Sequence, residues 1–274
     1  METTESAFSR WLDLPKQERK YYQTLTCVKV LGVSLPELYE FLQENQDHPQ
    51  FADSGVFVSA VLNSIPEKDI VFDLKLRNKF RGLGALLPKE KRLLNYNDIG
   101  ETFGFGAEGV VVNYGNAGWT MGGKARGLII NLGTRGLGFG AKSRGTLVDF
   151  GETRFAYDEF RDDNAGMNAD GMMIILHTDQ RFIRYDNSLE YVVTDESLRK
   201  NEGLGSYVLD VQQRLEEGRD DPRKTFEFLD ELGPDPGERI KEDVYRLVSA
   251  PRGSLKRFLI KADGYVRSAT GVGN

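Results

Sequence analysis

Short apolar runs recur along the middle of the chain at a fixed interval of 18 residues. The runs Val110–Val112 and Leu128–Ile130 each follow a glycine and precede an asparagine, and the rows that contain them share seven identities without a gap. Related rows begin at Lys91 and Gly145, and a fifth begins at Gly171 after an insertion of about eight residues. Helical repeats need about 33–47 residues, so this period predicts short strands joined by tight corners. Equivalent positions of neighbouring rows would then stack about 4.8 Å apart.

Alternation within each row predicts two apolar columns of opposite direction, because neighbouring residues of a strand point to opposite faces. We assign three columns to the interior: Leu94, Val112, Ile130, Val148 and Ile174; Tyr96, Tyr114, Leu132, Phe150 and Leu176; and, on a second strand, Phe103, Met121, Phe139 and Tyr157. The intervening column is expected to point outward and comprises Leu93, Val111, Ile129, Leu147 and Met173. Exposed apolar rows are typical of binding surfaces. A terminal helix or a partner should therefore cover this candidate apolar interaction column.

Glycine and asparagine fill the positions between the apolar columns. Seventeen of the 30 glycines lie between Gly82 and Gly151, and columns of glycine mark corners where the backbone needs positive φ or has no room for a Cβ atom. The corner glycines are Gly100, Gly104, Gly115, Gly118, Gly122, Gly133, Gly136 and Gly140. A polar column contains Asn95, Asn113, Asn131 and Asp149. Stacked amides can bond along such a column, so we interpret it as structural, with a polar binding row as the alternative.

Two of the corners contain the same glycine pattern. Segments 115–122 and 133–140 both read G-xx-G-xxx-G, and segment 97–104 has the same spacing with asparagine first. The pattern resembles the GXGXG family of right-handed β-helices, which includes the C-terminal domain of the glutamate synthase large subunit and one of the subunits of formylmethanofuran dehydrogenase. The resemblance covers residues 91–151 and departs in the fourth row, which keeps only Gly151. It implies a β-helix that acts as a structural spacer, with catalytic residues located elsewhere.

Both flanks of the repeats have apolar residues at helical spacing. The predicted helices span Pro15–Leu31, Leu35–Glu44 and Ser54–Ile65 before the repeats, and Leu204–Glu217, Pro222–Leu232 and Glu238–Val248 after them. Ser34 and Glu37 form a capping-box pattern, and 255–260 could form a strand. The fold expected is mainly β: an N-terminal helical region (1–72), a single-stranded β-helix, or β-solenoid, with 18-residue turns (73–195), and a C-terminal helical region (196–274).

Composition excludes several classes of protein. Two histidines and one cysteine cannot form a Cys/His zinc site or an iron–sulfur cluster. A single cysteine also forbids an intrachain disulfide, which fits a reducing compartment. No apolar run approaches the roughly 20 residues that span a bilayer, and the first residues do not resemble a signal peptide. The net charge of −6 argues against a generic nucleic-acid binder. We expect a cytoplasmic protein without a membrane or nucleic-acid partner.

Four basic residues in neighbouring rows form the main candidate site. Lys124 and Arg126 align with Lys142 and Arg144, and Arg135 is expected nearby. Four like charges this close repel one another unless they are matched. They are therefore either a site for an anion or an acidic partner, or a solvated edge that Glu108 and Asp162 partly neutralise.

Two further groups of residues have a chemical and a structural interpretation. His177 stands where a corner glycine is expected and could act in acid–base chemistry, although a corner or surface histidine is the simpler interpretation. The acidic residues Asp158, Glu159, Asp162, Asp163 and Asp170 could hold a divalent cation or form a solvated loop. The chain contains no nucleophile elbow, P-loop or histidine-rich metal motif, so no catalytic residue, metal or cofactor is predicted.

These observations favour a non-catalytic scaffold that binds protein partners or copies of itself. One alternative is a structural subunit of a complex similar to glutamate synthase or formylmethanofuran dehydrogenase, which rests on the glycine pattern. The other is an anion-binding protein or a small enzyme that uses the basic residues.

Overall fold

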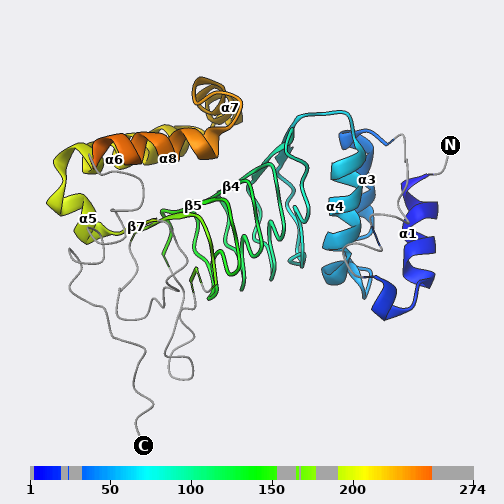
Figure 1. The fold of residues 1–274 in the computed structure, drawn as a ribbon. Helices are drawn as coiled ribbons and strands as arrows, with labels where there is room; N and C mark the ends of the chain where they lie inside the picture. Colours follow the sequence, from blue (N-terminus) through cyan, green and yellow to red (C-terminus); the bar gives the residue numbers. More distant parts are fainter. Residues whose placement is uncertain are drawn as a thin grey trace, which may run out of the picture.

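One parallel sheet of seven short strands runs through the centre of the molecule (Figure 1). The structure is a computed structural model of the 274-residue chain and describes residues 3–19, 24, 33–152, 165–166, 168–176 and 191–248. The strands lie side by side in chain order. They are β1 (Asp69–Phe72), β2 (Arg92–Asn95), β3 (Val110–Asn113), β4 (Leu128–Asn131), β5 (Thr146–Asp149), β6 (Met172–Ile175) and β7 (Tyr191–Val193).

The pairing of β2 to β5 follows the 18-residue repeat. Arg92 pairs with Val110, Val110 with Leu128, and Leu128 with Thr146. Thr146 then pairs with Met172, which is 26 residues later, so the connection from β5 to β6 is eight residues longer than the others. Each repeat therefore adds one four-residue strand to the growing edge of the sheet.

Turns, and not further strands, connect the strands of this sheet. Phe103 lies between Thr102 at φ 61° and Gly104 at φ 66°, and Thr120 at φ 58° precedes Met121. A strand needs negative φ at every residue, so the second strand expected at Phe103 and Met121 does not form. Outside the seven strands, the described residues contain one isolated bridge, between positions 117 and 135.

The predicted β-helix, or β-solenoid, is therefore wrong. The structure has a single parallel sheet of short strands flanked by helices, which is an α/β arrangement. Backbone hydrogen bonds nevertheless join the turns of neighbouring repeats: the amide of Gly122 donates to the carbonyl of Phe103 at 2.8 Å. The turns approach so closely that a Cβ atom on Gly133 would lie 1.8 Å from the carbonyl oxygen of Gly115, which explains why glycine recurs at this corner.

Both faces of the sheet are buried, each in its own apolar core. The first core contains the candidate apolar interaction column together with Phe103, Met121, Phe139 and apolar residues of the N-terminal helices. The second contains Leu94, Val112, Ile130, Val148 and Ile174 with apolar residues of the C-terminal helices. The expected directions are therefore reversed. The turns pack against the candidate apolar interaction column, which was expected to point outward. The C-terminal helices pack against the column of Leu94 and its equivalents, which was expected to point to the interior. Alternation separates the two faces but does not tell which structure covers each.

N-terminal helices close the β1 end of the stack (Figure 1). They are α1 (Thr4–Asp13), α3 (Leu35–Glu44) and α4 (Gly55–Ser64), with the 3-10 turns η1 (Lys16–Glu18) and η2 (Phe51–Ser54). The hydroxyl of Ser59 on α4 donates to the carbonyl of Gly82 at 2.9 Å. Lys91 Nζ donates to the carbonyls of Leu62 at 2.8 Å and Glu67 at 3.1 Å, at the end of α4, and burial lowers the pKa of this amine. These bonds attach the cap to the first repeat.

C-terminal helices cover the second face of the sheet (Figure 1). They are α5 (Asp195–Lys200), α6 (Glu202–Glu217), α7 (Pro222–Glu231) and α8 (Pro236–Leu247). Arg92 of β2 is buried beneath α7, where it pairs with Asp230 at 2.6 Å and with Asp69 of β1 at 2.5 Å. Thr146 Oγ1 of β5 donates to the carbonyl of Gly237 at 3.0 Å. Polar contacts thus fix the position of α7 and α8 on the sheet.

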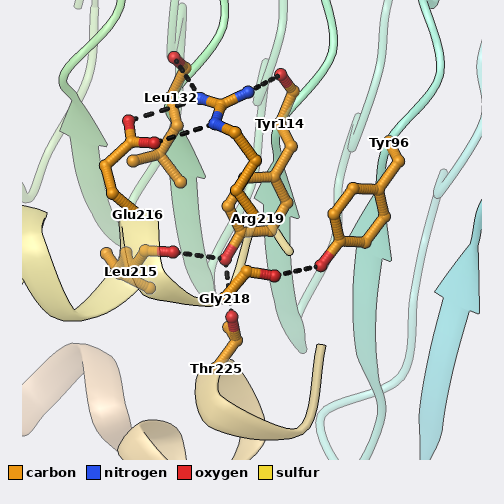
Figure 2. A network of polar contacts seen from close by, with 8 residues as sticks. All are labelled: Tyr96, Tyr114, Leu132, Leu215, Glu216, Gly218, Arg219 and Thr225. Atoms are coloured by element: carbon orange, nitrogen blue, oxygen red, sulfur yellow. Dashed lines mark hydrogen bonds and ion pairs between the residues drawn. The ribbon is translucent and has the colours of Figure 1, made fainter. Parts of the chain in front are cut away.

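Two stacked tyrosines bind the turn between α6 and α7 (Figure 2). Tyr96 Oη donates to the carbonyl of Gly218 at 2.6 Å, and Tyr114 Oη donates to the carbonyl of Leu215 at 2.8 Å. The ring centroids of Tyr96 and Tyr114 lie 4.7 Å apart. Burial raises the pKa of Tyr114 to about 12. Arg219 completes this docking cluster by donating to the carbonyl of Tyr114 at 3.1 Å.

The helix predictions agree with the structure at most positions. The capping box of Ser34 and Glu37 begins α3, and the predicted helices at 35–44, 54–65, 204–217, 222–232 and 238–248 correspond to α3, α4, α6, α7 and α8. Helices α1 and α5 were not predicted. The expected helix Pro15–Leu31 and the tail at 255–260 fall largely or wholly outside the described residues. Strand β1 lies before residue 73, where the repeat region was expected to begin.

Candidate functional site

Four cations of two neighbouring repeats lie together on one edge of the stack. Lys124, Arg126, Lys142 and Arg144 are exposed and precede β4 and β5, and we call them the basic edge. The amide of Arg144 donates to the carbonyl of Ala125 at 2.7 Å, and the amide of Lys124 donates to the carbonyl of Ala141 at 2.8 Å. Direct bonding between the two backbones keeps equivalent positions about 5 Å apart, as in a sheet. These backbone bonds align the two basic pairs on adjacent turns.

Both lysines of the basic edge adopt a backbone conformation that favours glycine. The φ angle is 56° at Lys124 and 60° at Lys142, and the equivalent position one repeat earlier is Gly106 at φ 68°. The left-handed conformation costs an L-residue about 1–2 kcal/mol, a cost that glycine avoids. Asn168, at φ 54°, occupies the same column in the next repeat. Glycine would avoid this cost at each of these positions, and only Gly106 uses it.

The four cations differ in how far the protein neutralises them. Arg126 pairs with Glu108 at 3.4 Å, in an exposed contact, and Lys124 Nζ lies 5.2 Å from the ring centre of Phe105. Lys142 and Arg144 make no ion pair with any residue that the structure describes. The pairing of β5 with β6 places Asp170 opposite Arg144. The described acidic residues at the two ends of the arginine column are therefore Glu108 and Asp170. Asp162, which was expected in this column, lies outside the described residues.

Arg135 does not belong to the basic edge. Its side chain is fully buried, its Nε donates to Asp149, its Nη1 donates to the carbonyl of Gly136 at 2.9 Å, and its guanidinium lies 5.1 Å from the ring centre of Phe139. The expected place of Arg135 near the four cations is wrong, because its position in the repeat faces inward. A charge with this many internal contacts serves the packing of the turns.

The polar column forms a continuous ladder along one side of the sheet. Asn95 Nδ2 donates to Asn113 at 2.7 Å, Asn113 to Asn131 at 2.8 Å, and Asn131 to Asp149 at 2.9 Å. All four side chains are fully buried. Each asparagine also donates to the backbone carbonyl two residues later. Asp149 can only accept, so it ends the ladder, and the buried Arg135 balances its charge. The contacts support the structural interpretation of this column.

A small cleft borders the basic edge at Arg126. It has a volume of about 290 Å³ and lies between the starts of β3 and β4 and the turn that leads into α8. Its lining includes Val110 and Leu128 of the sheet and Pro234 and Pro236 of the turn. The charged residues at the rim are Lys89 and Asp235, which pair at 3.2 Å, and Glu108 and Arg126. We call this feature the α8 cleft.

The other predicted sites fall inside the protein or outside the described residues. The candidate apolar interaction column Leu93, Val111, Ile129, Leu147 and Met173 is completely buried within this chain. It therefore presents no surface to a partner. His177 and the acidic residues Asp158, Glu159, Asp162 and Asp163 lie outside the described residues. Among the residues that are described, no group of three or more His, Cys, Asp or Glu side chains could hold a metal ion. No helix in this part of the chain is long and apolar enough to cross a membrane.

Sequence reasoning missed the docking cluster and the α8 cleft. Both features bring the repeats into contact with residues about 100 positions later in the chain. No local sequence pattern indicates that these distant residues are in contact. The proline pair of Pro234 and Pro236 marks a turn, but the sequence does not show that this turn faces Val110 and Leu128. The left-handed backbone at Lys124 and Lys142 could have been predicted from the sequence, because Gly106 occupies the equivalent position one repeat before Lys124.

No protein-family model, curated protein or solved structure matches this chain. The glycine pattern of residues 115–122 and 133–140 therefore stays a resemblance between motifs.

Proposed function

We propose that this chain is a non-catalytic interaction scaffold whose basic edge binds an acidic segment of a protein partner. The observation behind the proposal is the set of four exposed cations on two adjacent repeats, two of which are lysines at left-handed positions. Backbone strain at a position that the fold could fill without strain is a recognised sign of function. Here the strained residues are exposed, carry charge and flank two exposed arginines.

The backbone beneath the basic edge supports recognition because it is held in place before binding. The amide of Arg126 donates to the carbonyl of Ala107 at 2.8 Å, which continues the bonds at Lys124 and Arg144. Affinity improves when less freedom is lost on binding. Four cations on a fixed backbone lose only side-chain freedom, so a flexible acidic segment can bind them without ordering the scaffold.

The length of the basic edge favours an acidic peptide over a nucleic acid. Nucleic-acid binders typically neutralise many successive phosphates along an extended track. This edge spans two repeats, and Glu108 and Asp170 stand at the next positions of the arginine column on either side. Together with the net charge of −6, these carboxylates would repel a long polyanion that continues well past both ends of the edge. A short run of Asp and Glu fits the edge without reaching them.

A binding titration with a defined probe tests the proposal. Fluorescein-labelled hexaglutamate should bind the full chain, and binding should weaken as salt rises, because exposed charges are screened over about 10 Å at 0.1 M salt. Replacing Lys142→Glu and Arg144→Glu together should reduce affinity at least tenfold.

A second pair of basic residues provides the matched control. Arg223 and Lys224 are exposed at the start of α7, so Arg223→Glu with Lys224→Glu changes the net charge by the same amount. This control should bind hexaglutamate like the unchanged protein. Equal losses in both variants would show that only net charge matters, and absence of binding by the unchanged protein would contradict the proposal.

A further inference from the structure

The N-terminal helix α3 has a row of carboxylates on its exposed face. Glu37, Glu40 and Glu44 are all exposed, and they lie on one side of the helix, because residues three and four apart are neighbours on a helix surface. We call these three residues the acidic stripe. We propose that the acidic stripe of one copy of this chain binds the basic edge of a second copy. This inference rests on the proposed function and names the acidic segment that the basic edge binds.

The charge of the acidic stripe is not neutralised within the described part of the chain. Helix α3 is the one described α-helix that contains carboxylates and no basic residue. Glu40 and Glu44 form no ion pair with any residue that the structure describes. By contrast, Asp243 of α8 pairs with Arg239 of the same helix at 3.0 Å. The stripe therefore offers a partner three carboxylates of one sign, which complement the four cations of the basic edge.

The acidic stripe and the basic edge also agree in size. A helix rises about 1.5 Å per residue, so the seven residues from Glu37 to Glu44 span about 10 Å. Lys124 and Arg144 are two residues and one repeat apart, which gives the basic edge a diagonal of about 8 Å. A helix that lies along this diagonal places its three carboxylates over cations of both repeats, with little overhang toward Glu108 or Asp170.

Helix α3 is held in place before any partner binds. Three residues on its opposite face are buried in the first core: Leu38, Phe41 and Leu42. The hydroxyl of Tyr39 donates to the carbonyl of Val71 in β1, and the ring of Tyr39 lies 5.7 Å from that of Phe72. Because the backbones of both surfaces are already fixed, their association costs mainly side-chain freedom.

The two surfaces of one chain lie apart along the stack. Helix α3 is attached to β1, whereas the basic edge precedes β4 and β5 (Figure 1). Three to four strand spacings, about 14–19 Å, separate these positions, so a contact between the surfaces needs two copies. The contact joins two different surfaces, and each bound copy keeps one of each unoccupied. Repetition of such a contact builds a ring or an open chain of copies.

Sedimentation equilibrium of the full chain tests the inference. At about 0.01 M salt, where charges are screened over about 30 Å, the average molecular mass of the unchanged protein should rise with concentration. At about 1 M salt, where this length is about 3 Å, the mass should return to that of the monomer. Glu40→Lys with Glu44→Lys should weaken association at least tenfold, although it changes the net charge from −6 to −2 and so reduces general repulsion between copies.

Asp210→Lys with Glu227→Lys is the matched control. Both residues are exposed, on α6 and α7, and the two substitutions change the net charge by the same amount. This control should associate at least as strongly as the unchanged protein. Association that is lost equally in both double variants would overturn the inference.

Mixing two variants separates a lost contact from a misfolded protein. Glu40→Lys with Glu44→Lys reverses the acidic stripe, and Lys142→Glu with Arg144→Glu reverses part of the basic edge. Each variant should be monomeric alone, and the two should associate when mixed, because each then meets a surface of opposite charge. Failure of the mixture to associate would contradict the inference.

The outcomes also separate this inference from the proposed function. An unchanged protein that binds hexaglutamate but stays monomeric at low salt would overturn the contact between copies and leave the basic edge as a site for a different acidic partner. A protein that neither binds hexaglutamate nor associates would overturn both.

Discussion

At the scale of single residues, the repeats use polar side chains to fix their spacing. The ladder from Asn95 to Asp149 needs one amide in every repeat, because each asparagine donates to its neighbour and to a backbone carbonyl. The sequence revealed this column by its period alone. It did not reveal that Arg135 would balance Asp149, since their contact depends on how the turn folds back beneath β5.

Removing one amide from the ladder should destabilise the fold. Asn113→Ala leaves Asn131 Oδ1 and the carbonyl of Gly115 without their donor in a buried site, so the free energy of unfolding should fall by about 2–4 kcal/mol. Chemical denaturation measures this change. Asn116→Ala is the control: Asn116 is only half-buried, donates to Asp98 at 2.7 Å in an exposed contact and accepts from the amide of Thr134 at 3.3 Å. Water can reach these partners, so the loss should be smaller, about 1 kcal/mol. Equal losses of unfolding free energy in Asn113→Ala and Asn116→Ala would show that the buried ladder stabilises the fold no more than a partly exposed contact does.

The left-handed positions outside the basic edge give a second prediction at this scale. Thr102 and Thr120 have φ angles of 61° and 58°, and the next repeat has Gly138 at φ 80°. A β-branched residue is strained in this conformation, so Thr120→Gly should keep or raise the free energy of unfolding, by up to about 1 kcal/mol. Thermal unfolding measures the effect. A loss above about 1 kcal/mol would show that the threonine side chain stabilises its turn.

At the scale of elements, local patterns predicted helices better than they predicted strands. Capping and amphipathic spacing placed α3, α4, α6, α7 and α8, since these signals lie within each helix. The apolar column at Phe103 and Met121 suggested a strand that does not form. Alternating positive φ at Thr102 and Gly104 prevents it, and a threonine gives no warning of that conformation.

The docking of α6 and α7 on the sheet should depend on the ionisation of Tyr114. Its pKa is raised to about 12 by burial, whereas an unfolded tyrosine titrates near pH 10. A raised pKa gives stability that is complete below about pH 10 and is lost as the pH rises through about 12. At neutral pH, Tyr114→Phe should lower the free energy of unfolding by about 1 kcal/mol, because Leu215 and Thr225 lose their partner.

Comparing the stability of the unchanged protein and of Tyr114→Phe at two pH values separates the ionisation of Tyr114 from that of the other tyrosines. Between pH 10 and 12 the unchanged protein should lose more stability than Tyr114→Phe, so the difference between them should shrink. Urea unfolding at pH 8 and pH 11 measures both values. A constant difference would contradict the assignment of the pKa shift to Tyr114.

At the scale of the whole molecule, the repeat predicted the pairing of β2 to β5 but not the layers around the sheet. Both faces of each strand are apolar, so the sequence could not decide that turns cover Leu93 and its equivalents while helices cover Leu94 and its equivalents. For the same reason the expected binding column is buried. The basic edge was predictable because its four residues stay within two adjacent rows, whereas the α8 cleft requires α8 to lie on the sheet.

We propose that the basic edge serves binding and not folding. The most direct test is the double substitution Lys124→Gly with Lys142→Gly, which restores the residue that the backbone favours and removes two charges. We expect the free energy of unfolding to be unchanged or higher by up to about 1 kcal/mol per site, while affinity for labelled hexaglutamate falls at least tenfold. Unchanged affinity, or a marked loss of stability, would contradict the claim.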